Sequence, residues 1–187
     1  MISRIEYLCI RIQYVFWIKM FLWLLTVCML QCTVQASYEV VFEDAECFDI
    51  NEKYIKECEI NVDYDSEYGS KLDAYLEILE TPYDSIKLEV DTFTTQMGEY
   101  TLPMAIHLED DLCKFVREEN SMGYLFIKSI NIGTCPPKPG IYKQEKFVIN
   151  NMDALPSSFP EGHYLLNSTL SSEDIVLFRI NLYVRVY

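Results

Sequence analysis

Apolar and polar residues alternate along much of the chain, most clearly near its C-terminus. Every even position from Val176 to Val186 is apolar, and the odd positions between them include Arg179 and Asn181. A period of two is typical of a β-strand with one buried and one solvated face. This stretch contains no proline and no inward-facing charge that would protect an exposed edge, so we expect the last strand to be central in its sheet.

The same periodicity predicts seven to nine short strands, separated by turns rich in glycine and proline. Candidate strands are residues 38–42, 55–64, 72–79, 85–92, 100–107, 141–149, 163–170 and 174–187. Closely spaced short strands without alternating helices predict an all-β domain, an immunoglobulin-like antiparallel β-sandwich with room for an apolar cavity between its sheets.

One stretch, residues 109–118, has helical spacing. Leu112, Phe115 and Val116 fall on one stripe, and three acidic residues precede them where a helix N-terminus favours negative charge. We therefore expect one short helix in the domain.

The N-terminus has the pattern of a secretory signal peptide. Basic residues in the first 19 positions precede an apolar run at residues 20–30, and small residues follow at 34–36. The alternative, an uncleaved membrane anchor, needs about 20 uninterrupted apolar residues, whereas Lys19 divides the run. We expect residues 1–36 to be a signal peptide and residues 37–187 to be one secreted, extracellular domain. Met20 is an alternative start of a shorter signal.

Four of the seven cysteines lie in the expected mature domain: Cys47, Cys58, Cys113 and Cys135. An even number in a secreted domain indicates two disulfide bonds, for which three connectivities exist. A zinc site is disfavoured because no two of these cysteines form a C-x-x-C pair. The sequon Asn167-Ser168-Thr169 predicts a glycoprotein with glycan at Asn167, on an exposed turn.

The expected mature domain is strongly acidic. Cleavage removes three basic residues and one acid, which leaves 12 Lys and Arg against 28 Asp and Glu, a net charge of −16 on 151 residues. Such a domain repels nucleic acid and anionic membrane surfaces. Nucleic acid is therefore not an expected partner.

The last third of the chain carries the most specific motifs. C-P-P-K-P-G-I-Y at residues 135–142 is followed by an apolar strand, L-P-S at 155–157, G-H-Y at 162–164 and the final alternating strand. This order resembles the ganglioside-activator class of lipid-recognition domains. With L-C-K-F at 112–115 ahead of it, the frame looks most like the insect chemosensory protein B family. The resemblance covers about residues 100–187.

The resemblance implies a β-sandwich whose two sheets separate around an apolar pocket. It implies a non-enzymatic lipid carrier, associated in the insect branch with taste organs and contact-pheromone detection. It also implies a Cys113–Cys135 disulfide. The activator pattern has a cysteine in its final strand bonded to the N-terminal one, but the final strand here has none, which leaves Cys58 as the partner of Cys47.

We therefore expect a secreted protein that binds a lipid or long-chain hydrocarbon and presents it to a membrane receptor or channel. The alternative is a secreted interaction domain with a filled core that modulates such a receptor through its acidic surface. No hydrolase, metalloprotease or phosphate-loop motif is present, so we expect no enzyme activity, cofactor or metal. Candidate pocket walls, which would equally suit a filled core, are Leu76, Ile78, Leu88, Val90, Phe93, Leu102, Met104, Ile106, Phe115, Phe126, Phe159 and Tyr164.

Overall fold

The computed structural model describes residues 38–65, 69–81, 85–149, 154–155 and 159–187, together with residues 19, 20 and 23. The chain divides into two compact units, Met1–Ser37 and Tyr38–Tyr187. Most of the expected signal peptide lies outside the described residues. Only Lys19, Met20 and Trp23 are described there, and all three are helical. None of the described helices is long and apolar enough to cross a membrane.

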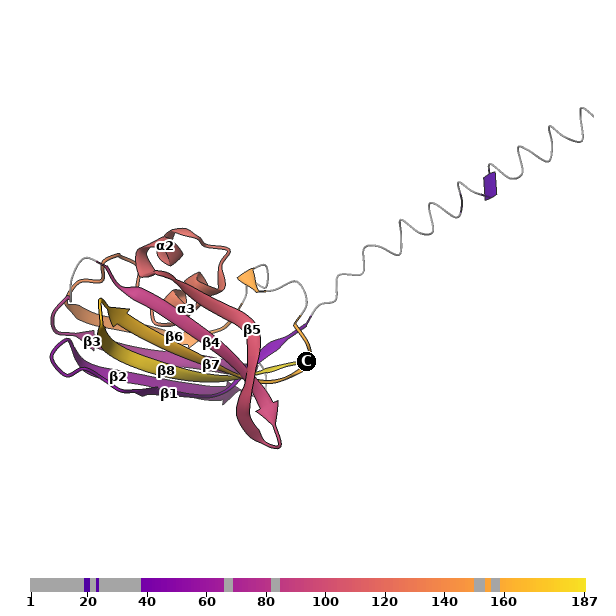
Figure 1. Ribbon diagram of the computed structural model, residues 1–187, viewed down its shortest axis with the longest axis horizontal. Coiled ribbons are helices and arrows are strands. Elements are labelled where there is room, and N and C mark those ends of the chain that lie inside the picture. The colour runs from indigo at the N-terminus through magenta and orange to yellow at the C-terminus, as the bar shows by residue number, and fades with distance from the viewer. Residues whose placement is uncertain are drawn as a thin grey trace, which may run out of the picture. The chain divides into compact units, whose positions relative to one another are not determined.

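The second unit is an all-β sandwich of two antiparallel sheets, as the alternation predicts (Figure 1). All eight candidate stretches contain a strand. Their bounds are β1 (Val40–Phe48), β2 (Ile55–Asp65), β3 (Gly69–Ile78), β4 (Lys87–Gln96), β5 (Glu99–Asp111), β6 (Gly140–Phe147), β7 (Gly162–Ser172) and β8 (Ile175–Val186). The larger sheet has the order β1-β8-β7-β4-β5, and the smaller one has the order β2-β3-β6.

The last strand is central, which confirms the sequence prediction. β8 pairs with β1 on one side and with β7 on the other. Its even-numbered residues face inward, and Phe178, Ile180 and Val184 are buried. β8 therefore carries a large part of the core of the larger sheet.

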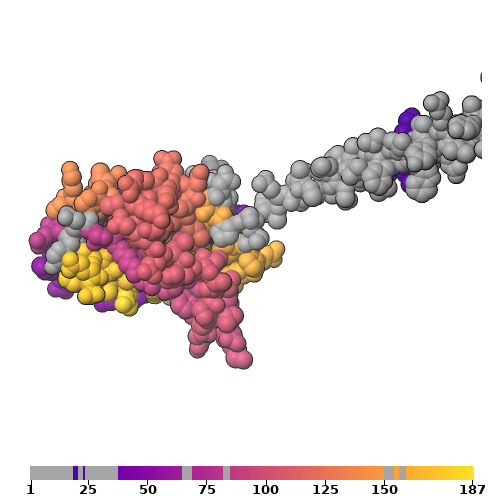
Figure 2. All heavy atoms as spheres, turned by 45° about the horizontal axis from the view of Figure 1, so that its top comes forward, coloured from indigo at the N-terminus to yellow at the C-terminus, as the bar shows by residue number. Residues whose placement is uncertain are grey.

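The hairpin between β4 and β5 projects from the sandwich (Figures 1 and 2). Its two-residue loop consists of Met97 and Gly98, both with positive φ, which suits the right-handed twist of paired strands. β5 forms one edge of the larger sheet and contains Pro103, a residue that strands tolerate at edges.

The helix prediction is wrong at its start and in number. Residues Glu109–Asp111 continue β5 and pair with Lys87–Glu89. The helix α2 (Leu112–Arg117) begins only after Asp111, whose side chain accepts a hydrogen bond from the backbone N–H of Cys113. Strand pairing thus outweighs the helical tendency of the acidic residues. A second short helix, α3 (Met122–Ser129), was not predicted.

Two links join the sheets on the β1 side. The Cys47–Cys58 disulfide connects β1 to β2, and the backbone N–H of Phe42 donates to Ser70 Oγ on β3 at 2.7 Å. A second disulfide, Cys113–Cys135, ties α2 to the chain that follows α3. Both predicted disulfides are therefore confirmed. A three-stranded sheet cannot cover a five-stranded one, and α2 and α3 cover part of what it leaves (Figure 1).

Candidate ligand-binding cavity

An apolar cavity of about 60 Å³ lies between the inner face of the larger sheet and α3. Six strands, the helix α3 and the segment after β6 contribute to its wall, and eleven of its thirteen lining residues are apolar. The lining residues are Phe42, Val90, Leu108, Met122, Leu125, Phe126, Ser129, Phe147, Ile149, Leu155, Leu166, Ser168 and Leu182. Several of these, including Leu108, Leu166 and Leu182, are only half-buried, so the cavity is not sealed like the centre of the core.

The helix α3 covers the cavity with one face. Met122, Leu125, Phe126 and Ser129 follow the spacing i, i+3, i+4 and i+7, which places them on one side of a helix. Ser121 caps the helix by accepting a hydrogen bond from the backbone N–H of Tyr124 at 3.1 Å. These two signals were present in the sequence and would have predicted α3.

Close packing between the helices fixes α3. A Cβ atom added at Gly123 would lie 2.3 Å from the ring of Phe115 on α2, so only glycine allows this approach. Leu112 on α2 is fully buried, and its backbone N–H donates to the carbonyl of Ile86 at 2.7 Å. The cover of the cavity, the helix α3, is thereby attached to the larger sheet through α2.

The floor of the cavity is formed by paired residues on neighbouring strands. Leu108, Val90 and Ser168 are successive partners across β5, β4 and β7. Leu166 and Leu182 are partners across β7 and β8, one pair further along the sheet. The alternation in β7 and β8 therefore determines which side chains reach the cavity.

Two buried hydroxyl groups of the inner sheet face have no hydrogen-bond partner among the residues that the structure describes. They belong to Ser168 on β7, which lines the cavity, and to Thr92 on the neighbouring strand β4. Ser168 is 1% exposed. Ser129 lines the cavity from α3, and its hydroxyl donates to the carbonyl of Phe126 at 2.7 Å. The described lining residues include no charged side chain.

The structure brings together only two of the twelve predicted wall residues in this cavity, Val90 and Phe126. Five others are buried in the main core: Leu76, Ile78, Leu88, Phe115 and Tyr164. Met104 and Phe159 are half-buried and pack against that core. Phe93 and Ile106 are also half-buried, whereas Leu102 is 46% exposed. The ligand contacts of these ten residues stay predictions.

The aromatic pair of Phe159, which precedes β7, and Tyr164, which lies within it, belongs to the packing of the core. The rings of Phe159 and Tyr164 meet edge to face at 4.7 Å between centroids. Tyr164 donates its hydroxyl to the carbonyl of Pro160 at 2.7 Å, and burial raises the pKa of its phenol. These contacts favour a structural role over ligand contact.

The predicted glycosylation residue, Asn167, lies within β7 rather than on an exposed turn. It is half-buried, and its side-chain amide donates to Asn181 Oδ1 on β8 at 2.7 Å. Asn181 in turn donates to Glu46 Oε1 on β1 at 2.7 Å. Glycosylation at Asn167 stays a prediction, and a glycan there would have to accommodate this polar chain across three strands.

Charged residues gather on the outer face of β4 and β5. His107 Nδ1 lies 2.8 Å from Asp91 Oδ1, and its Nε2 lies 3.4 Å from Glu109 Oε2. The hydrogen bond to Asp91, followed by that to Glu109, raises the pKa of His107. Glu89, Asp91 and His107 could each offer one metal-ligand atom within 4.8 Å of the others. His107 already pairs with Asp91 and Glu109, so we assign this surface cluster no metal.

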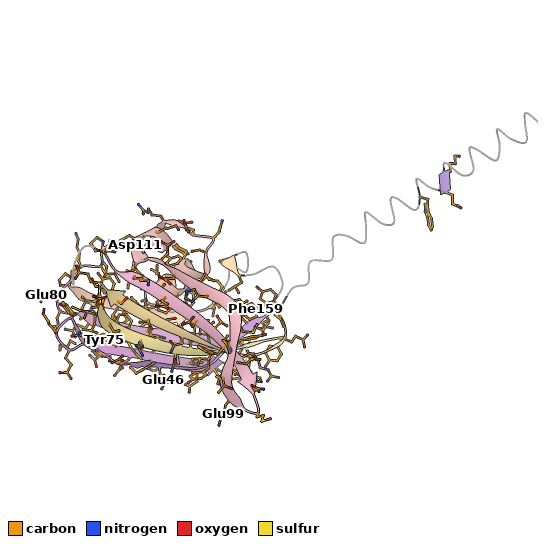
Figure 3. All side chains as sticks on the ribbon, viewed as in Figure 1. Glu46, Tyr75, Glu80, Glu99, Asp111 and Phe159 are labelled. Atoms are coloured by element: carbon orange, nitrogen blue, oxygen red, sulfur yellow. A yellow bond between two sulfur atoms is a disulfide. The ribbon has the colours of Figure 1, made fainter. Side chains whose placement is uncertain are left out.

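A larger hollow of about 570 Å³ lies on the outer face of the smaller sheet. Its wall includes Glu57, Glu59, Asp73, Tyr75 and Lys143 (Tyr75 is labelled in Figure 3). It is polar as well as open, and a ligand there would exchange contacts with water for contacts with charged groups. We favour the smaller cavity as the ligand site because burying an apolar surface provides a larger net driving force.

A family model described as "Protein of unknown function (DUF1091)" matches residues 88–166. The match extends from β4 into β7 and includes both helices and ten of the thirteen residues that line the apolar cavity. The chain is thus similar to that family over less than half of its length. No curated protein matches the chain.

Proposed function

We propose that this protein is a secreted carrier that binds an apolar small molecule between the larger sheet and α3. The observation that supports the proposal best is the unsealed, almost wholly apolar cavity at that position. Burial of a hydrocarbon gains roughly 0.8 kcal/mol for each methylene group, so apolar walls alone can hold a chain.

The motif order of the last third supports the same function. Its resemblance to the ganglioside-activator class, and most closely to the insect chemosensory protein B family, favours a lipid or long-chain hydrocarbon as ligand. It also favours a role in contact-pheromone detection, with presentation of the ligand to a membrane receptor or channel. Two disulfides suit an oxidising, extracellular compartment.

The size of the cavity determines how binding must proceed. A volume of about 60 Å³ is far below the roughly 300–1,000 Å³ typical of pockets for drug-sized ligands. A long chain therefore requires α3 to move away from the sheet, whereas the core around Leu88 and Phe178 stays closed. The cover is held to the sandwich through α2 and the Cys113–Cys135 disulfide, so its outward movement is limited.

The alternative function, an interaction domain with a filled core, also has a specific observation in its favour. The sandwich has a large core of buried apolar side chains, and the larger hollow is acidic and lies on an outer face. The larger hollow could receive a basic segment of a receptor or channel. The two functions differ in whether an apolar molecule binds inside.

Filling the cavity tests the proposal directly. The substitution Val90→Phe places a larger side chain in the cavity wall. We expect the fold to tolerate it, because the added ring enters the cavity, and we expect binding of the neutral fluorescent probe N-phenyl-1-naphthylamine to be lost. Leu88→Phe is a matched control, because Leu88 lies on the same face of β4 but is fully buried and does not line the cavity. Overpacking there should lower stability by about 1–3 kcal/mol and leave probe binding intact.

Native mass spectrometry of the wild-type protein after mild extraction provides the second measurement. A bound apolar molecule that is absent from Val90→Phe supports the carrier. Wild-type protein that binds neither probe nor extractable molecule, with Val90→Phe destabilised as much as Leu88→Phe, favours the filled-core alternative.

A further inference from the structure

Ser168 places a hydroxyl group without a partner inside an otherwise apolar cavity. Its Oγ is buried, accepts and donates no hydrogen bond among the described residues, and lies on the cavity floor between its strand partners Val90 and Ile180. Leaving a buried hydroxyl unpaired is unfavourable, and native proteins rarely do so without a compensating partner.

A second serine on the same face of β7 shows how an inward-facing serine is otherwise accommodated. Ser172 is fully buried too, but its hydroxyl donates to the carbonyl of Ser85 at 2.9 Å. Ser129, facing the cavity from α3, also has a backbone partner. Of these three serines, only Ser168 retains an unused donor and acceptor.

We infer that Ser168 determines ligand specificity by hydrogen bonding to a neutral oxygen-containing group of the ligand. This inference rests on the proposed carrier function. The ligand would be an oxygenated hydrocarbon, such as a ketone, alcohol or ester, whose polar group lies deep in the cavity beside β7. A plain alkane would leave the hydroxyl of Ser168 unpaired.

The uncharged lining of the cavity disfavours an ionised head group at that depth. The described lining residues contain no cationic side chain, and an isolated carboxylate moved out of water is strongly disfavoured. The ligand class is therefore neutral and oxygenated, rather than an ionised fatty acid with its carboxylate buried inward.

The test compares octan-2-one, octane and octanoate in displacing N-phenyl-1-naphthylamine from the full-length secreted protein and from Ser168→Ala at neutral pH. In Ser168→Ala, the affinity for octan-2-one should fall about tenfold, because one hydrogen bond is lost. The affinity for octane should stay the same or rise, and octanoate should bind weakly to both proteins. Probe affinity is measured separately for each variant and used to correct the displacement.

Ser172→Ala is the matched control, because it removes a buried hydroxyl from the same face of the same strand but outside the cavity. It should leave the ratio of octan-2-one to octane affinity unchanged. Ser168→Ala keeps the Asn-x-Thr sequon, so it does not alter glycosylation. Its melting temperature should equal or exceed that of the wild type.

Outcomes separate this inference from the carrier function. The role of Ser168 is overturned if Ser168→Ala changes the affinities for octan-2-one and octane in parallel, or leaves the affinity for octan-2-one unchanged. A lower melting temperature of Ser168→Ala overturns it too. In each case the carrier function stands. Failure of the wild type to bind the probe and all three compounds overturns the carrier function and this inference together.

Discussion

Ser168 and Ser172 lie on the same face of β7, yet their hydroxyl groups have different environments. Ser172 donates to a backbone carbonyl next to β4, which satisfies its donor where water is absent. Ser168 faces the cavity, and within the described part of the chain its buried hydroxyl has no partner, like that of Thr92 on β4. A sequence pattern assigns all of these residues to the inner face but cannot show which hydroxyl finds a partner.

His107 provides a pH-dependent prediction on the opposite face of the sheet. Its hydrogen bonds to Asp91 and Glu109 favour the protonated imidazole, so its titration midpoint should lie above the ordinary pKa of 6.5. The Asp91→Asn variant should return the midpoint toward 6.5. NMR titration of the imidazole protons measures it, with His163→Gln used to assign the two histidines.

The stability linked to His107 has a defined direction. Because the pKa of His107 is higher in the folded protein than in the unfolded chain, protonation of His107 stabilises the fold, and this stabilisation is fully present at pH values below the unfolded-state pKa of 6.5. That stabilisation is lost as the pH rises through the folded-state pKa. Asp73→Asn, on the smaller sheet, should leave the midpoint unchanged, and an unchanged midpoint in Asp91→Asn would contradict the assigned cause.

At the scale of elements, strands were predictable where the alternation was strict. β3, β7 and β8 have inward residues that are apolar or small at every second position, so both the strands and their buried faces follow from the sequence. The acidic end of β5 was assigned to a helix instead. Only pairing with β4, a contact distant in sequence, fixes Glu109–Asp111 as strand (Figure 3 shows Asp111 and Glu99 at opposite ends of β5).

The two disulfides should contribute similarly to stability but differently to binding. Each closes a short loop, and the chain-entropy model assigns about 3 kcal/mol to such a loop. The Cys113–Cys135 disulfide lies at the two ends of the segment that contains α3 and so anchors this cover, whereas the Cys47–Cys58 disulfide joins the sheets at β1 and β2. The double variant Cys113→Ser/Cys135→Ser should therefore lose probe binding as well as stability.

The matched double variant Cys47→Ser/Cys58→Ser should lose a similar amount of stability and retain probe binding below its melting temperature. Urea unfolding measures the stability, and amide hydrogen exchange should show faster exchange in α3 only in the first variant. Equal exchange in α3 of both double variants would mean that the Cys113–Cys135 bond does not hold the cover.

At the scale of the whole molecule, the sequence predicted the sandwich but only part of the cavity. The fold class follows from local alternation, which each strand carries by itself. The cavity depends on how a five-stranded sheet is covered by three strands and two helices. This arrangement is set by contacts distant in sequence, such as the hydrogen bond from the backbone N–H of Leu112 to the carbonyl of Ile86. Val90 and Phe126 were identified because they are large and apolar, while Ser168 was considered only as part of a glycosylation sequon.

The central position of β8 predicts that its core residues control the stability of the whole sandwich. Phe178 is 2% exposed and lies on the inner face of the strand that joins β1 to the rest of the larger sheet. Phe178→Ala should lower the free energy of unfolding by about 3–5 kcal/mol, a large part of the roughly 5–15 kcal/mol typical of a domain. Urea unfolding should still show one transition with an unchanged slope.

Arg185→Ala on the same strand is the control, because Arg185 faces outward and its guanidinium lies 4.5 Å from the centre of the Tyr187 ring. Its loss should change stability by less than about 1 kcal/mol. Both tryptophans of the chain, Trp17 and Trp23, lie before the predicted cleavage site. Unfolding of the mature domain is therefore followed by circular dichroism and tyrosine fluorescence. If Phe178→Ala and Arg185→Ala unfold at the same urea concentration, then β8 does not hold the core together, since its buried face would contribute no more than its solvated one.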